Sequence, residues 1–270
     1  MPELPEVETT CKGLIPHVVG RRVTSLVVHQ ASLRIPVPDS LNDLVGQRID
    51  ALHRRAKYLI FETERGRMVI HLGMSGSLRI CDAAVPLRKH DHVVIELEDG
   101  QQMRYHDPRR FGLVDWTQGE WQQMRWFKTL GPEPLTDDFN AAYLAEKAEG
   151  RKVAIKSFIM SNPVVVGVGN IYACEALFMA RIHPKRVVGK VSGKRLTVLV
   201  EAIKDRLAAA IVSGGTTLRD FVREDGQPGY FKQELMVYGR EGEPCRKCEA
   251  IIKRVVIGQR STFYCGRCQR

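Results

Sequence analysis

The chain has 270 residues, of which 44% are apolar and 27% charged, and its formal net charge is +10. This composition is ordinary for a soluble globular protein, and no apolar run approaches the roughly 20 residues that a membrane helix needs. The N-terminus is acidic where a signal peptide would be basic and then apolar, so we expect a cytoplasmic protein. The positive charge favours a polyanionic partner, nucleic acid rather than membrane, although a protein that is merely basic is the alternative.

The first half of the chain predicts one helix followed by strands. A helix is expected over residues 3–15, where early prolines are tolerated and acidic side chains suit the positive helix end. From residue 23 to about 114 the pattern indicates short strands, which predict an antiparallel sandwich or barrel. Examples of the expected strands are Val23–Val28, Tyr58–Glu62, Met68–Leu72 and a hairpin from His92 to Tyr105 that turns at Asp99-Gly100.

Beyond a proline-containing linker at Leu130–Leu135 the periodicity becomes helical. Helices are expected at Ile155–Ser161, Ile171–Ala180 and Leu196–Ile211. Between the first two, Gly167 and Gly169 permit a tight turn, and Asn170 is a suitable N-cap. The free N–H groups of such a helix end can bind a DNA phosphate, and an ordinary turn is the alternative.

The C-terminal tail carries four cysteines and much of the positive charge. Cys245, Cys248, Cys265 and Cys268 form two CxxC pairs, a spacing typical of a tetrahedral zinc site. A redox CxxC or reduced surface cysteines are the alternatives. Residues 236–270 hold eight Lys or Arg against three Glu, which is +5. Cys11, Cys81 and Cys174 are expected to pack as small hydrophobes.

Between the cysteine pairs the sequence predicts a β-hairpin. Its strands are Ile251–Ile257 and Ser261–Tyr264, joined through Gly258-Gln259-Arg260. Zinc would hold this hairpin, and its turn would project Arg260 towards a phosphate, since a guanidinium binds phosphate with two parallel hydrogen bonds. A structural hairpin with a solvated arginine is the alternative.

The N-terminus offers a nucleophile. Removal of Met1 would expose the secondary amine of Pro2, and an amine that attacks a sugar C1′ forms a Schiff base. Glu3 lies next to it and could move protons. Taken alone, Met-Pro-Glu is also typical of an ordinary helix start.

Two loops carry side chains that suit a base-extruding enzyme. Arg109, Arg110 and Phe111 lie on a turn after a strand, and Met74 lies on the turn Gly73–Gly76. Apolar wedges beside an arginine can fill a duplex from which a base has been extruded. The alternatives are a salt-bridged loop and a core methionine. His90 and His92 share a strand face but have no third metal ligand nearby, and Lys57 is by default a solvated cation.

Together these segments resemble the formamidopyrimidine-DNA glycosylase family over nearly the whole chain. The matching motifs, in chain order, are PELPEVET at 2–9, RRAKYL at 54–59, HLGMSGSL at 71–78, KHDHV at 89–93, DPRRFG at 107–112, LGPEPL at 130–135, VVGVGNIYACEAL at 165–177, PGYFKQELMVYGR at 228–240 and the four-cysteine tail.

The resemblance implies a role for each matching residue. Pro2 is expected to be the Schiff-base nucleophile with Glu3 as proton donor, Lys57 the β-elimination residue and Arg260 the δ-elimination residue. DNA-backbone contacts are expected at His90, Arg109, Arg151 and Asn170. Met74, Arg109 and Phe111 would fill the gap, with Arg109 reading the orphaned cytosine. Residues Thr216–Tyr230 correspond to the loop that closes over the extruded base.

The resemblance also implies an α+β fold in three parts. These are an N-terminal helix with an antiparallel β-sandwich (residues 1–130), a helical DNA-binding domain with a helix-two-turn-helix (131–235) and a β-hairpin zinc finger (236–270). The expected protein is a nucleoid-associated monomer with one structural Zn²⁺. It would excise 8-oxoguanine and formamidopyrimidines from damaged double-stranded DNA and then cleave the strand by β,δ-elimination.

Two alternatives stay open. A sister branch of the family acts on oxidised pyrimidines, but Leu4 in PELPE and the sequence GEPC at 242–245 favour the purine branch. The second alternative is a DNA-binding protein without catalysis, which would have no use for Pro2 beside Glu3. A zinc hydrolase is excluded, because four cysteines leave no open coordination position.

Overall fold

The computed structural model describes residues 2–214 and 235–270. The chain divides into two compact units, one built on residues up to 128 and the other on residues 129–212 together with the C-terminal segment. Among the described residues no helix is long and apolar enough to cross a bilayer.

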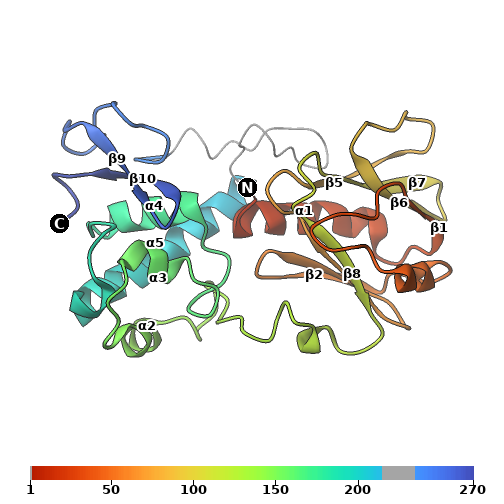
Figure 1. Cartoon of the computed structure of the whole chain (residues 1–270), viewed down its shortest axis with the longest axis horizontal. Coiled ribbons are helices and arrows are strands. Elements are labelled where there is room, and N and C mark those ends of the chain that lie inside the picture. Colours follow the sequence, from red (N-terminus) through yellow and green to blue (C-terminus); the bar gives the residue numbers. More distant parts are fainter. Residues whose placement is uncertain (1, 215–234) are drawn as a thin grey trace. The chain divides into compact units, whose positions relative to one another are not determined.

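The first unit is a sandwich of two four-stranded antiparallel sheets, which confirms the predicted sandwich (Figure 1). One sheet has the order β1 (Val23–Val28), β6 (Asp91–Leu97), β7 (Gln101–His106) and β5 (Ser77–Asp82). The other has the order β2 (Ala51–Arg55), β3 (Tyr58–Glu62), β4 (Arg67–His71) and β8 (Leu113–Thr117). Alternate side chains of both sheets, such as Val93 and Ile95 or Leu59 and Phe61, share one core.

Helix α1 (Leu4–Val18) packs on this core and contacts β2, β3 and β5 (Figure 1). Val7, Cys11, Leu14 and Val18 recur at helical spacing and lie in the same buried cluster. The helix ends three residues beyond the expected residue 15 and contains Pro16 in its last turn. Burial of Val18 outweighs the local cost of that proline.

The strands named as examples were largely correct. β1 and β3 have the expected bounds, and β4 starts one residue earlier than expected. The hairpin of β6 and β7 turns at Asp99-Gly100, where Gly100 has φ +81°. β2, β5 and β8 were not among these examples, although β2 and β5 lie within the stretch expected to form strands. β2 has two arginines among its five residues and buries only Leu52.

The second unit contains the helices α2 (Ala141–Ala148), α3 (Ile155–Ile159), α4 (Asn170–Met179) and α5 (Gly193–Val212). Short 3₁₀ turns occur at Asp39–Leu44 and Trp121–Gln123 in the first unit and at Val188–Lys190 in the second. The expected linker Leu130–Leu135 contains neither helix nor strand. In α4 every residue from Ile171 to Phe178 is buried, so this helix is the centre of the unit.

The prediction of Asn170 as an N-cap was wrong. The cap residue is Gly169, and Asn170 is the first residue of α4. The Asn170 side chain is used in tertiary hydrogen bonds instead, which leaves it unable to cap its own helix. α3 also ends at Ile159, two residues before the expected Ser161.

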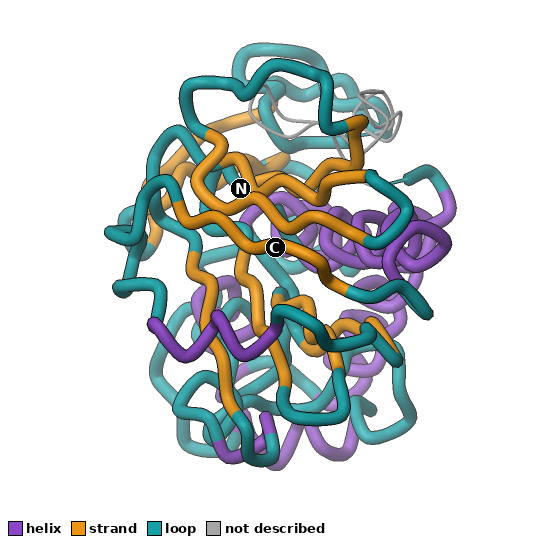
Figure 2. The backbone as a smooth tube through the Cα atoms, turned by 90° about the vertical axis from the view of Figure 1, so that its right-hand side faces the viewer, coloured by secondary structure: helices purple, strands orange, loops and turns teal. Residues whose placement is uncertain are grey.

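The C-terminal hairpin consists of β9 (Ile252–Ile257) and β10 (Arg260–Cys265), among the orange segments of Figure 2. Its turn is Gly258-Gln259, with φ of +54° and +61°, the signs that a type I′ turn requires. Arg260 was expected to lie in the turn. It is instead the first residue of β10 and pairs with Ile257.

The hairpin and its cysteines are fastened to α4. Cys174 and Phe178 pack in one buried cluster with Val237, Ile252 and Cys265. The fully buried carboxylate of Glu175 accepts hydrogen bonds from the backbone N–H groups of residues 236, 237 and 238 at 2.8, 2.9 and 2.9 Å. A buried charge needs several such partners, so Glu175 fixes where the tail begins.

Candidate nucleic-acid and zinc sites

The first candidate catalytic residues lie at the start of α1. Glu3 is 2% exposed and forms a capping box with Glu6: the Glu3 side chain accepts from the Glu6 backbone, and the Glu3 N–H donates to Glu6 Oε2 at 2.8 Å. Pro2 is buried directly before this cap. The Glu3 carboxylate is thus held beside Pro2 at the positive end of the helix.

Lys57 lies on the two-residue turn between β2 and β3, where Ala56 has φ +55°. Arg54 joins this turn to α1, since its Nε contacts Glu8 Oε2 at 2.6 Å and its Nη1 donates to the Ala56 carbonyl at 3.0 Å. The turn that carries Lys57 and the helix that begins after Glu3 are therefore connected through one guanidinium.

His71 links Lys57 to the turn that carries Met74. Burial, followed by the positive charges of Lys57 and Arg34, lowers the pKa of His71 to about 3. The ring is therefore neutral, and its Nδ1 accepts a hydrogen bond from Gly73 N at 2.9 Å. Lys57 lies close enough to His71 for its charge to act on the ring.

Asp107 holds the two candidate gap-filling loops together. This fully buried carboxylate accepts from Ser75 Oγ at 2.9 Å, from Tyr105 OH at 3.1 Å and from Gly112 N at 2.9 Å. Ser75 belongs to the Met74 turn, and Gly112 ends the loop with Arg109 and Phe111. One side chain thus fixes both loops.

The two loops touch at glycines. A Cβ added to Gly73 would lie 2.3 Å from the nitrogen of Gly112, so no other residue fits there without movement. Arg109 stacks over Phe111 with 4.9 Å between guanidinium carbon and ring centroid, and Phe111 is 47% exposed. The structure thereby brings the turns of Met74, Arg109 and Phe111 together and presents an aromatic ring to solvent.

His90 adjoins the same loop. Its carbonyl accepts from Asp107 N at 3.0 Å, and His92 Nε2 contacts the Asp107 carbonyl at 2.8 Å. Within the part of the chain that the structure describes, the four cysteines are the one group of three or more possible ligands placed to hold a metal ion.

In the second unit a buried lysine organises the other candidate contacts. Lys156 is 1% exposed, and its ammonium donates to Asn170 Oδ1 and, at 2.6 Å, to Thr262 Oγ1. Asn170 Nδ2 donates to the Ser261 carbonyl at 2.9 Å, and Thr262 Oγ1 donates to the Arg260 carbonyl at 3.1 Å. The start of α4 and the start of β10 are thus joined beside Arg260.

Sequence reasoning missed Lys156, Asp107 and Glu175. A signal existed for Lys156, a lysine inside the apolar run 155–159, since a buried lysine must be paired. Arg151 is exposed just after α2, and its backbone forms hydrogen bonds with Ala148 and Gly189. Within the described ranges, the hydrogen bonds of Arg151 and those of Asn170 involve different partners. The expected lesion loop, Thr216–Tyr230, lies outside the described residues.

The four tail cysteines have the geometry of a zinc site. Their sulfurs all lie within 4.8 Å of one another, with Cys245 and Cys268 at 3.9 Å and Cys248 and Cys265 at 3.4 Å. A tetrahedral ion with Zn–S bonds of about 2.3 Å requires sulfurs about 3.8 Å apart. The cluster fits one structural Zn²⁺ per chain. Cys11 and Cys174 are buried as expected, whereas Cys81 is partly exposed.

Three family models match the chain. The formamidopyrimidine-DNA glycosylase N-terminal domain matches residues 1–114, the formamidopyrimidine-DNA glycosylase H2TH domain matches 130–222, and a zinc finger found in FPG and IleRS matches 242–270.

Individual relatives are similar over the full length. A protein of Alcanivorax borkumensis named formamidopyrimidine-DNA glycosylase is 56% identical and matches over 100% of both chains. The Lactococcus lactis Fpg, solved with DNA that contains an abasic site, has TM-score 0.92 and 33% identity over 99% of both chains. MutM solved with DNA that contains carbocyclic 8-oxo-G has TM-score 0.92 and 34% identity over 100% of both chains.

Proposed function

The chain belongs to the formamidopyrimidine-DNA glycosylase family, and from that premise we propose that it excises oxidised purines from duplex DNA and then cleaves the strand. Solved relatives bind DNA with an abasic site and DNA with an 8-oxoguanine analogue, the product and substrate forms of this reaction. The oxidised-pyrimidine branch and a non-catalytic DNA-binding protein are not favoured by these relatives.

The observation that carries the proposal is the pair of loops held by Asp107. An enzyme that extrudes a base must fill the space left in the duplex. The Met74 turn and the Arg109–Phe111 loop supply a thioether, a guanidinium and an exposed ring, and they are fixed to one buried carboxylate. Loops fixed in this way can enter the duplex without a large cost in ordering them.

The proposed chemistry begins at Pro2. Once Met1 has been removed, the Pro2 nitrogen attacks C1′ of the damaged nucleotide, and the bond from C1′ to the base breaks as the base takes a proton from Glu3. The first product is an aminal in which C1′ still carries its ring oxygen. The C1′–O4′ bond then breaks as O4′ takes a proton, and the opened sugar is joined to Pro2 as an iminium. Loss of a C2′ proton then expels the 3′ phosphate, and a second elimination expels the 5′ phosphate. We assign Lys57 to the first elimination and Arg260 to the second.

The remaining assignments concern binding. We propose that His90, Arg109, Arg151 and Asn170 contact the DNA backbone, and that Arg109 also reads the unpaired cytosine. Zinc stabilises the hairpin and takes no part in the reaction. In this proposal the chain has three parts: the sandwich (residues 1–130), the helical domain with its helix-two-turn-helix (131–235) and the zinc finger (236–270). The protein would act as a monomer, in the cytoplasm at the nucleoid.

The decisive test blocks the Pro2 amine. A variant with one Gly inserted between Met1 and Pro2 should lose both excision of 8-oxoguanine and borohydride trapping on abasic DNA, because no secondary amine is left at the terminus. Binding of an uncleavable abasic analogue should stay within about threefold of the unmodified chain. Trapping at the original rate by the extended protein would overturn the assignment of Pro2.

A duplex series tests the substrate class separately. The duplexes carry 8-oxoguanine, formamidopyrimidine or thymine glycol, each opposite all four bases. Those with either purine lesion should be cleaved faster than those with thymine glycol. Preference for thymine glycol would place the chain in the pyrimidine branch instead.

A further inference from the structure

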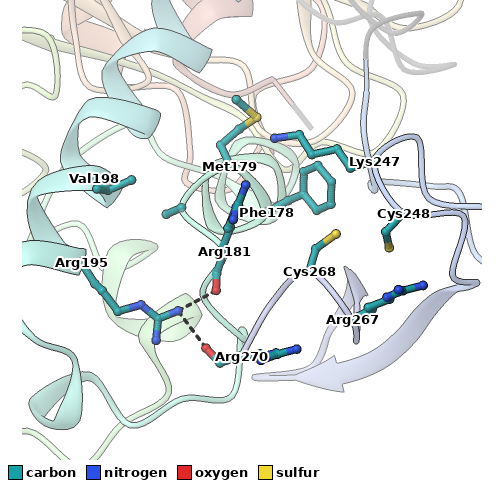
Figure 3. A pocket seen from close by; sticks show the side chains of 11 residues that line it. Phe178, Met179, Arg181, Arg195, Val198, Lys247, Cys248, Arg267, Cys268 and Arg270 are labelled. Atoms are coloured by element: carbon teal, nitrogen blue, oxygen red, sulfur yellow. Dashed lines mark hydrogen bonds between the residues drawn. The ribbon is translucent and has the colours of Figure 1, made fainter.

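A cavity of about 810 Å³ lies within the second unit at the C-terminal end of α4, and nothing in the proposed reaction uses it (Figure 3). It is formed by the end of α4, the first turns of α5 and both cysteine loops of the tail. Its lining residues are Phe178, Met179, Ala180, Arg181, Arg195, Val198, Lys247, Cys248, Arg267, Cys268 and Arg270.

The lining is strongly cationic. It includes four arginines and one lysine, and it contains no acidic side chain. A zinc ion with four thiolates carries a net charge of about −2. Five cations exceed that charge, so neutralisation of the zinc site does not account for all of them.

The cavity also has an apolar floor. Met179 of α4 and Val198 of α5 are 36% and 43% exposed. The Phe178 ring lies between them and the tail, with Lys247 Nζ 5.3 Å from its centroid (Figure 3). Phe178 itself is fully buried, so Met179 and Val198 form the accessible part of this floor. The flexible thioether of a methionine adapts well to apolar side chains of a partner.

One wall of the cavity is held in place. Arg195 Nη2 donates to the carbonyls of Arg181 at 2.6 Å and Arg270 at 2.9 Å, shown as dashed lines in Figure 3. This arginine ties α5 to the end of α4 and to the tail. The other cations surround a cavity that is formed before any ligand arrives.

The cavity is separate from the proposed DNA contacts of this unit. Asn170 and its hydrogen bonds lie at the first residue of α4, whereas the cavity begins at Phe178. A helix rises about 1.5 Å per residue, which places the two roughly 12 Å apart along α4.

We propose that this cavity binds an acidic peptide segment of a partner protein, with one apolar side chain seated on Met179 and Val198 and carboxylates among the surrounding cations. Clusters of arginines recognise acidic motifs in this way. A concave site with an apolar floor suits a peptide better than a duplex, whose backbone is convex and offers no apolar group. The cavity is also too large for a single phosphate.

The test uses a fluorescein-labelled peptide, Asp-Glu-Phe-Asp-Glu, and fluorescence anisotropy at 0.15 M salt with the full-length zinc protein. Binding should weaken at least tenfold when Phe is replaced by Ser, and at least tenfold when Arg181→Glu and Lys247→Glu are combined in the protein. The matched control combines Lys185→Glu with Lys190→Glu, which are exposed and do not line the cavity; it should bind the peptide within about threefold of the unmodified protein.

Zinc content and 8-oxoguanine excision are measured on each variant, so that loss of folding is detected separately. Met179→Ser supplies a second variant that changes the floor without changing charge. Absence of peptide binding, or equal loss in the control pair, would overturn the proposal. If the Arg181 and Lys247 pair loses affinity for undamaged duplex as strongly as for peptide, the cavity is a nucleic-acid contact instead.

Discussion

Arg109 and Phe111 are both exposed, and the guanidinium lies over the ring. In the vacated space of a duplex this arginine can donate to O2 and N3 of an unpaired cytosine, whereas adenine offers a poorer set of acceptors. A buried donor left without a partner costs about 1–3 kcal/mol, or roughly one to two decades in rate.

We therefore expect excision of 8-oxoguanine to be ten- to a hundredfold faster opposite cytosine than opposite adenine, and Arg109→Ala to remove most of that preference. Single-turnover rates on both pairs measure it. Lys190→Glu, outside every proposed contact, serves as the control. Unchanged discrimination in Arg109→Ala would mean that Arg109 only binds phosphate and that the opposite base is read elsewhere.

His71 should make stability depend on pH. Its pKa is about 3 in the folded protein, held down chiefly by burial, against 6.5 as the ordinary value. Below pH 6.5 the unfolded chain therefore binds more protons than the folded one, and the stabilisation present above pH 6.5 is lost as the pH falls towards 3. The expected loss is about 1.4 kcal/mol per pH unit.

The change His71→Asn removes this titration and keeps an acceptor near Gly73 N. The free energy of unfolding in urea should therefore fall more steeply between pH 6.5 and pH 4 in the unmodified protein than in the variant. If the free energy of unfolding fell equally with pH in both proteins, protonation of His71 would not destabilise the fold.

Single residues were predictable where their chemical role requires a characteristic spacing between residues of one type. The four cysteines are such a case. Asp107 and Glu175 are not, because each carboxylate accepts a hydrogen bond from a distant segment, the Ser75 hydroxyl or the backbone N–H groups of residues 236–238, and such a contact leaves no sequence pattern. Pro2 and Arg260 had weak signals of their own, as a terminal amine and a phosphate-binding guanidinium, and the elimination roles of Lys57 and Arg260 came from the family resemblance.

At the level of elements, the zinc module gives a direct prediction. Cys268→Ser should lower the zinc content from one ion per chain to none and unfold the hairpin, because structural zinc supplies the folding energy of so small a module. Affinity for lesion-containing duplex should then fall at least tenfold, because Arg260 is no longer held by Lys156 through Thr262.

Cys81→Ser is the matched control, since Cys81 is partly exposed in β5 and remote in sequence from the tail. It should keep its zinc and its affinity. Active protein without zinc, measured by atomic absorption, would contradict the assignment of the cluster.

Elements with a clear sequence signal were predicted well, and those shaped by tertiary contacts were not. β1 and β3 are rich in β-branched or aromatic residues, and the apolar residues of α5 have helical spacing. β2 has two arginines among its five residues, and Arg54 bonds to Glu8 and to the Ala56 carbonyl, so the sequence of this strand shows no clear strand pattern. α4 was offset by one residue because Asn170 bonds to Lys156 and Ser261 rather than to its own helix end.

For the whole molecule, the charge of +10 predicts that DNA binding depends steeply on salt. A protein that contacts six to ten phosphates loses about 10³–10⁵ in affinity between 50 and 200 mM salt, because it displaces condensed counterions. We expect this range for lesion-containing duplex. Arg151→Ala should weaken binding to all sequences alike and reduce the slope of log K against log salt by about one.

The control for Arg151 is Lys185→Glu with Lys190→Glu, which should leave the slope nearly unchanged if those exposed lysines make no phosphate contact. A slope for Arg151→Ala equal to that of the unmodified protein would remove Arg151 from the set of backbone contacts.

The attachment of the tail to α4 has a consequence for synthesis. The elements of the sandwich all lie within the first 117 residues, so they can fold while the ribosome is still adding the rest of the chain. The second unit cannot, because Cys174 and Phe178 are covered by Val237, Ile252 and Cys265, and Arg270 N still bonds to the carbonyl of Arg181. Ribosome-bound nascent chains should therefore carry a protease-resistant sandwich beside helices that stay sensitive until the zinc hairpin has left the ribosome and bound its ion.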